Sequence, residues 1–114
     1  MNLIRGTIVL VSLDPTRGHE QRGVRPCVII TDLEVIQDQR FPMVCVIPVT
    51  KTQGEGALYP SLDPGSSGLR TRSYALVDQV RSVDKRRITK IFGQISDGEL
   101  KKIDEGLHLF LGLR

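Results

Sequence analysis

The sequence predicts a mainly β protein: a small, partly open antiparallel barrel of the SH3-like type with one C-terminal α-helix. The 114 residues suit one domain, which we expect to span residues 1–114. Only 4% of the residues are aromatic and there is no Trp, so the core must consist of aliphatic, largely β-branched side chains, which favour strands. At least five short apolar runs precede a single convincing helical pattern, which indicates an antiparallel barrel rather than a parallel α/β sheet.

The apolar runs give the expected strands of the first half in order. Residues 6–13 (GTIVLVSL), 27–31 (CVIIT) and 43–49 (MVCVIPV) are each predicted to form a strand. The polar segment 32–42 has room for one helical turn. Residues 57–62 follow the turn KTQGEG, and we expect them to form a hairpin with the third strand.

A broken strand is predicted next, over residues 74–83 (YALVDQVRSV). Asp78 and Gln79 interrupt its apolar pattern, which indicates a bend or bulge with these polar side chains turned outward. A turn and a short strand near Ile91 follow.

The predicted helix covers residues 96–112. Ser96 and Glu99 have the spacing of a capping box. Gly106 in the interior costs about 1 kcal/mol relative to Ala, so we expect a packing reason for it. The apolar side chains that recur on one face are Leu100, Ile103, Leu107, Phe110 and Leu111.

Composition excludes several classes of function. The net charge of +3 is a mild basic excess that permits a polyanionic partner. Cys27 and Cys45 lie inside apolar runs and are expected to be buried free thiols. Without a CxxC pair or a Cys/His cluster, no metal site and no cofactor is expected. The first fifteen residues are too short and too regularly alternating for a signal peptide or a membrane span, so we expect a cytoplasmic protein without a membrane partner.

The segment DPTRGHEQRGVRP, residues 14–26, concentrates ionisable groups between two strands. Arg17, Arg22 and Arg25 offer planar guanidinium groups that match phosphate oxygens in a bidentate manner. Glu20 is the obvious proton acceptor of the segment. A solvated connector, an anion-binding loop and part of an active site are the three interpretations.

Arg25 differs from the other two arginines. It precedes Pro26, which favours extended geometry, and it lies at the mouth of an apolar strand. Thr50 has the matching position at the end of the third strand. If the two strands are neighbours, a guanidinium and a hydroxyl group would converge on one phosphate.

The block from Arg5 to Pro26 resembles the opening signature of the MazF/PemK family of bacterial toxins, in which a strand leads into D-P-x-x-G-x-E-Q-x-G-x-R-P. The later blocks, including ALVDQVRSVDKRRI and the closing helix, are similar to those of the family, so the resemblance spans essentially the whole chain. It implies a CcdB/PemK-type barrel, a homodimer, and a metal-independent, sequence-specific endoribonuclease. It also implies cleavage of single-stranded mRNA into 2′,3′-cyclic phosphate and 5′-OH ends. The implied partner is a MazE-like antitoxin with a disordered acidic tail.

The residues are compatible with this chemistry. Internal transesterification needs a proton acceptor at the 2′-OH and positive charge on the phosphorane. Glu20 is the candidate acceptor, Arg25 the candidate stabiliser of charge, and Thr50 the candidate contact to a phosphate oxygen. Candidates for reading unpaired bases or contacting phosphates are Gln21, Arg17, Arg22, Asp78, Gln79, Arg81, Arg86 and Arg87.

Two other functions remain open on this fold. One is a non-catalytic toxin that binds a protein target such as DNA gyrase, and the other is a plain SH3-like RNA-binding module. Fold alone does not separate the three. The E-Q-x-G-x-R-P block favours the nuclease.

Overall fold

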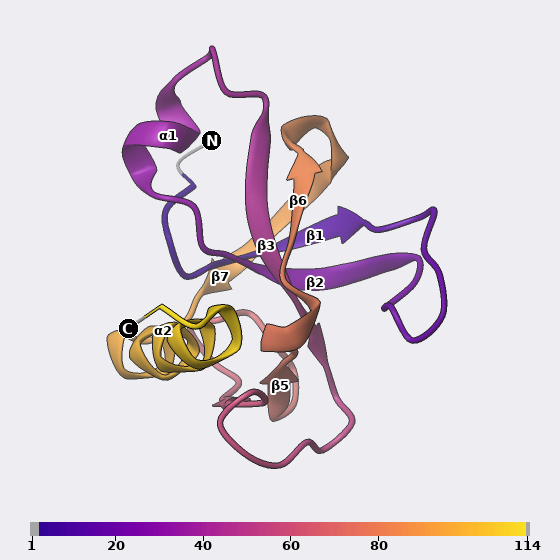
Figure 1. Ribbon diagram of the computed structural model, residues 1–114, viewed down its shortest axis with the longest axis vertical. Coiled ribbons are helices and arrows are strands. Elements are labelled where there is room, and N and C mark those ends of the chain that lie inside the picture. The colour runs from indigo at the N-terminus through magenta and orange to yellow at the C-terminus, as the bar shows by residue number, and fades with distance from the viewer. Residues whose placement is uncertain (1–2, 114) are drawn as a thin grey trace.

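The computed structural model describes residues 3–113, which form a curled antiparallel sheet with a long helix packed against one end (Figure 1). The strand order is β4-β5-β3-β2-β1-β7, and β6 pairs with β3 outside this path. The mainly β barrel with a C-terminal helix is therefore confirmed. The strands are β1 (Thr7–Ser12), β2 (Val24–Ile29), β3 (Met43–Thr50), β4 (Ser61–Leu62), β5 (Ser73–Ala75), β6 (Arg81–Asp84) and β7 (Ile88–Gln94).

Strand β3 organises the sheet, because both of its edges are used. One edge pairs with β2. The other edge pairs with β6 near Met43 and with β5 at Thr50. Between these two short strands lies the 3-10 turn η1 (Val77–Gln79), so the predicted interruption at residues 78–79 is confirmed.

The predicted hairpin between residues 57–62 and β3 is wrong. Only Ser61–Leu62 form a strand, and this strand pairs with β5. The edge of β3 that it would have used is already occupied by β5 and β6. The expected helical turn after β2 is present as α1 (Leu33–Gln37).

Apolar side chains pack on both faces of the curled sheet, as alternation along each strand requires. One cluster contains Val9, Val11, Cys27, Ile29 and Val46 among others. The second cluster joins Ile8, Val28, Ile47 and Val49 to Ile103 and Leu107 of the helix. The sheet thereby holds β2 and β3 rigidly between two layers of core.

Helix α2 (Asp97–Leu111) begins with the predicted capping box at Ser96. Gly106 is buried where a Cβ atom would lie 2.8 Å from the Ala57 carbonyl oxygen, which is the packing reason expected for it. Phe110 and Leu111 are 45% and 53% exposed, so the prediction that they belong to the packed face is wrong. The helix continues past the surface it covers, and every residue from His108 to Leu113 is exposed.

Among residues 3–113, no helix is both long enough and apolar enough to span a membrane.

Candidate functional site

Arg25 and Thr50 are brought together by the pairing of β2 with β3. The antiparallel register ends at the pair Cys27–Pro48, and Arg25 and Thr50 each lie two residues beyond this pair, on the same side of it. Both residues line one cavity of about 620 Å³. The convergence expected if the two strands were neighbours is therefore present.

This cavity, which we call the Arg25–Thr50 cavity, has a strongly basic lining. It contains no carboxylate, and its four basic residues are Arg25, Lys51, Arg70 and Lys90. The last three were missed by the sequence analysis, because Arg70 and Lys90 come from segments far along the chain that only the sheet order brings here. A concave, uniformly basic surface concentrates anions such as phosphate.

The guanidinium of Arg25 is anchored at one nitrogen only. Its Nε atom donates a hydrogen bond of 2.9 Å to the carbonyl oxygen of Arg22. Within the described part of the chain, no hydrogen bond uses its two Nη atoms. These are the atoms that form a bidentate contact to a phosphate.

Glu20 lies in a neighbouring hollow rather than in the Arg25–Thr50 cavity. This hollow, of about 180 Å³, is also lined by Gln21, Gln79 and Arg81. The Oε1 atom of Glu20 accepts a hydrogen bond of 3.0 Å from the backbone N–H of Arg17, and its Oε2 atom lies 4.0 Å from Arg81 Nη1. A third hollow, lined by Gln21, Thr50 and Gln79, shares residues with both, so the three hollows are neighbours, and we refer to them together as the groove.

Turn η1 fastens the β1–β2 loop. The side chain of Gln79 accepts a 2.8 Å hydrogen bond from the backbone N–H of Gln21 and donates one of 3.3 Å to the carbonyl oxygen of His19. This side chain was expected to turn outward; it is half-buried and turns toward the β1–β2 loop, where both ends of its amide are used.

The adjacent residue of η1, Asp78, holds the loop after β3 in the same way. Its Oδ2 atom accepts a 2.7 Å hydrogen bond from the hydroxyl group of Tyr59, and this bond raises the pKa of Tyr59. Its Oδ1 atom is buried and has no protein partner among the described residues. Asp78 too is turned inward, so one 3-10 turn ties down both loops that border the groove.

The other predicted arginines do not form one continuous rim. Arg81 lines the hollow with Glu20 while donating to the Leu13 carbonyl oxygen, and Arg87 donates to the carbonyl oxygens of Ser12 and Asp14. Arg86 is paired with Asp84, which lies opposite Met43 at the other end of β3 from Thr50.

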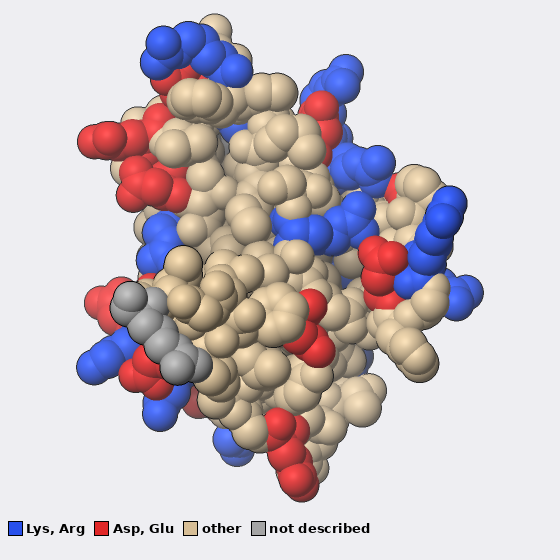
Figure 2. All heavy atoms as spheres, viewed as in Figure 1, with Lys and Arg blue, Asp and Glu red and all other residues tan. Residues whose placement is uncertain are grey.

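Basic side chains gather over the β1–β2 loop and near β6, with carboxylates among them (Figure 2). Arg17 and Arg22 are exposed members of that loop. Of these arginines, Arg81 lines the groove, Arg17 and Arg22 lie exposed on the adjoining loop, and Arg86 is separated from it.

The two thiols are free, as predicted, but the expected burial holds for Cys27 only, since Cys45 is half-buried. Cys27 is fully buried, and burial raises its pKa to about 12. No group of three or more His, Cys, Asp or Glu side chains in residues 3–113 is arranged to hold a metal ion.

Residues 4–111 match the model of a protein family described as the PemK-like, MazF-like toxin of type II toxin–antitoxin systems. The chain belongs to this family. Endoribonuclease EndoA of Bacillus subtilis (strain 168) is 31% identical over 113 residues, covering 96% of this chain and 94% of that protein.

Solved structures show the same fold. The crystal structure of MazF from Deinococcus radiodurans superposes with a TM-score of 0.83 at 24% identity and covers 99% of both chains. An endoribonuclease from a mycobacterial species, in complex with its cognate antitoxin, gives a TM-score of 0.81 at 19% identity, covering 98% of this chain and 97% of that chain. At these identities the likeness is one of fold.

Proposed function

We propose that this toxin is an endoribonuclease that cuts single-stranded RNA at specific sequences without a metal ion. The observation that carries the proposal is the basic cavity in which Arg25 and Thr50 meet at the ends of paired strands. A relative with 31% identity is named an endoribonuclease, which supports the same reading.

The proposed reaction is an internal transesterification. The ribose 2′-OH attacks the adjacent phosphorus, the bond from phosphorus to the 5′-oxygen breaks, and the products carry 2′,3′-cyclic phosphate and 5′-OH ends. The Nη atoms of Arg25 contact the negative charge that develops on the phosphorane. The hydroxyl of Thr50 donates a hydrogen bond to a phosphate oxygen.

Glu20 is the proposed acceptor of the 2′-OH proton. Its carboxylate lies in the hollow next to the Arg25–Thr50 cavity, so this role needs the RNA backbone to cross from one hollow to the other. Arginine holds its proton too tightly to be an effective general acid, so Arg25 is assigned to charge stabilisation only.

Around this centre, Gln21 is proposed to read an unpaired base, and Arg17, Arg22 and Arg81 to contact phosphates along the groove. A phosphate contact also remains a prediction for Arg87 and, outside the groove, for Arg86. Asp78 and Gln79 act, in our proposal, by holding the loops through the contacts described above rather than by reading bases.

The partners follow from the family and from the groove. We propose a symmetric homodimer, because one small domain over residues 1–114 buries limited surface alone. A MazE-like antitoxin with an acidic, disordered tail would compete with RNA for the basic groove, since both are extended polyanions. The proposed location is the cytoplasm, where mRNA is accessible.

Incubation of the purified chain with a defined long RNA in EDTA tests the activity. Discrete fragments are expected, with 5′-OH ends that polynucleotide kinase labels without prior phosphatase treatment, and with 3′ ends that resist extension until the cyclic phosphate is removed. Mapping the 5′ ends gives the recognised sequence. Intact RNA would refute the nuclease and leave the two other functions. Binding of RNA without cleavage would then indicate the RNA-binding module, and binding to gyrase would indicate the non-catalytic toxin.

A further inference from the structure

A row of polar side chains continues across the sheet beyond the Arg25–Thr50 cavity. Thr50 of β3 is paired with Tyr74 of β5, and Tyr74 is paired with Ser61 of β4. Directly opposed residues of neighbouring strands point to the same face, about 5 Å apart. Residues one position away, such as Val49 and Ala75, are buried in the core, so the row faces away from it.

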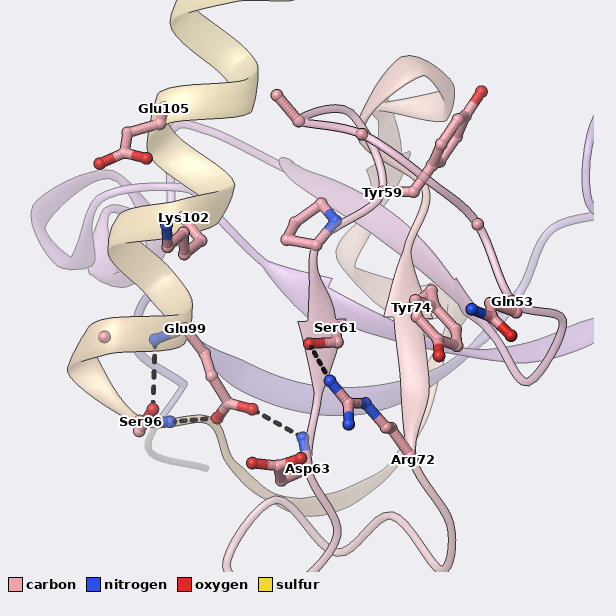
Figure 3. Close-up of a pocket in the computed structure, with 15 residues that line it drawn as sticks. Gln53, Tyr59, Ser61, Asp63, Arg72, Tyr74, Ser96, Glu99, Lys102 and Glu105 are labelled. Carbon is pink, nitrogen blue, oxygen red and sulfur yellow. Dashed lines mark hydrogen bonds between the residues drawn. The ribbon is translucent and has the colours of Figure 1, made fainter.

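The far end of this row forms one wall of a larger cavity, of about 900 Å³, whose opposite wall is the first half of α2 (Figure 3). Arg72 lies two residues before Tyr74 and donates a 3.1 Å hydrogen bond from Nη2 to the Ser61 hydroxyl. The cavity shares Gln53 and Tyr59 with the hollow that Thr50 lines, so it continues the groove.

We infer that this larger cavity is a nucleotide subsite of the RNA groove, in which the ring of Tyr74 stacks on a base next to the scissile phosphate and Arg72 contacts a flanking phosphate. The inference rests on the proposed nuclease function. Tyr74 is the direct cross-strand neighbour of Thr50, so a base on its ring belongs to a nucleotide adjoining the phosphate that Thr50 would hold. An aromatic ring accepts any base by stacking, whereas polar neighbours select among bases.

The mixed charge of the cavity favours a nucleotide over an acidic peptide. Arg72 and Lys102 can meet a phosphate, and the carboxylates of Asp63 and Glu105 can accept hydrogen bonds from base amino groups. Glu99 is already occupied, because it accepts from the backbone N–H groups of Ser96 and Asp63. An acidic side chain offers no donor to these carboxylates, whereas a base offers its amino groups.

Substitutions at Tyr74 test the stacking. The probe is a short RNA that contains the mapped cleavage sequence and is made non-cleavable by a 2′-deoxy group at the scissile nucleotide. Tyr74→Leu, which keeps an apolar side chain but removes the ring, should weaken binding about 5- to 100-fold. Tyr74→Phe should bind within about threefold of the wild type, since the ring remains. With cleavable RNA, Tyr74→Leu should raise KM and relax the base preference at the adjoining position.

The chain also offers a direct optical readout, since it has no Trp and only two Tyr residues. Stacking of a base on the ring of Tyr74 should quench the tyrosine fluorescence, and this quenching should be lost in Tyr74→Leu. Arg72→Ala removes one phosphate contact, so the slope of log K against log salt concentration for RNA binding should become shallower by about one. Arg40→Ala is its matched control, because Arg40 is 83% exposed and paired with Asp38 outside the groove.

The outcomes separate this inference from the proposed function. If the wild type neither binds nor cleaves RNA, the proposed function fails, and the subsite fails with it. If the wild type cleaves RNA but Tyr74→Leu keeps the KM and the base preference, only the subsite is refuted. An equal loss of RNA affinity in Tyr74→Leu and Tyr74→Phe would refute stacking. If Tyr74→Leu loses binding to the antitoxin but keeps its RNA binding, the cavity would be assigned to the antitoxin peptide instead.

Discussion

At the scale of single residues, Arg25 combines exposure with a rigid backbone, since it lies in a strand paired on one side with β1. Arg25→Ala should therefore keep the fold and reduce the cleavage rate by about 10²–10³, the usual cost of one electrostatic contact to a transition state. Arg25→Lys should also be badly impaired, because an ammonium group cannot form the bidentate contact. Single-turnover cleavage of a short RNA measures both, with Arg40→Ala as the control. Near-normal turnover by Arg25→Ala would remove this residue from the mechanism.

The thiol of Cys27 makes stability depend on alkaline pH. Burial raises its pKa from 9.0 to about 12, so the folded protein keeps the proton that the unfolded chain releases above pH 9. The stabilisation is fully present below pH 9 and is lost as the pH rises towards 12, at no more than about 1.4 kcal/mol per pH unit.

Urea unfolding at several pH values between 8 and 11 should show this decline. Tyr59 adds to it in the same direction, because its pKa is also raised, so the informative comparison is with Cys27→Ala. That variant should be less stable at pH 8 but should lose stability less steeply above pH 9. Parallel pH profiles would contradict the assignment.

At the scale of elements, turn η1 decides how firmly the β1–β2 loop is held. Gln79→Ala removes two hydrogen bonds and should lower the free energy of unfolding by about 1–3 kcal/mol. Amide exchange at Gln21 should become faster, while exchange at Val46 in the centre of β3 should change only with the global stability. Gln79→Glu keeps the acceptor for the Gln21 N–H and loses the donor to His19. Its free energy of unfolding should therefore lie between those of the wild type and Gln79→Ala. Unchanged exchange at Gln21 would show that the loop is held by other contacts.

Helix α2 contains two glycines that should respond to the same substitution with opposite sign. Gly98→Ala should stabilise the protein by about 0.5–1 kcal/mol, because no neighbouring atom is closer than 4.0 Å to the added Cβ. Gly106→Ala should destabilise it by about 1–3 kcal/mol, because its Cβ would lie 2.8 Å from the Ala57 carbonyl oxygen and 3.2 Å from Val77 Cγ2. Thermal unfolding of both variants is the measurement. A stabilising Gly106→Ala would mean that α2 shifts away from the sheet easily.

The elements also show where prediction from sequence succeeds. Strands with a continuous apolar run, such as β1 and β3, were placed correctly because both of their faces are buried in the core. Strands β4 and β5, with only two and three residues, carry no such pattern, and their pairing depends on which edge of β3 remains open. The prediction that the last turn of α2 is packed was wrong for a related reason. Periodicity predicts which face of a helix is apolar, but it does not predict how far the surface beneath that face extends.

The site was predictable to the same degree. Arg25 and Thr50 could be predicted because each ends a recognisable strand. Lys90 could not, because β7 reaches this region only through its pairing with β1. The inward orientation of Asp78 and Gln79 was missed because polar residues at a bend usually face solvent, and their partners lie 19 and 58 residues away in the chain.

At the scale of the whole molecule, we expect a homodimer. Multi-angle light scattering at micromolar concentration should give twice the mass of 12.7 kDa. Dilution should reveal dissociation only at much lower concentration if the interface is of the obligate kind. A monomer at micromolar concentration would contradict the prediction.

The separation of the polar row from the buried layer beneath it has a consequence for redesign. Thr50, Tyr74 and Ser61 alternate with Val49, Ala75 and Leu62, which are almost completely buried. Outward positions can therefore be exchanged while the inward ones keep the sheet assembled. A library randomised at Ser61, Arg72 and Tyr74 alone would retain folding in most members, and it would provide a route to nucleases retargeted to new RNA sequences with Arg25 and Thr50 left in place.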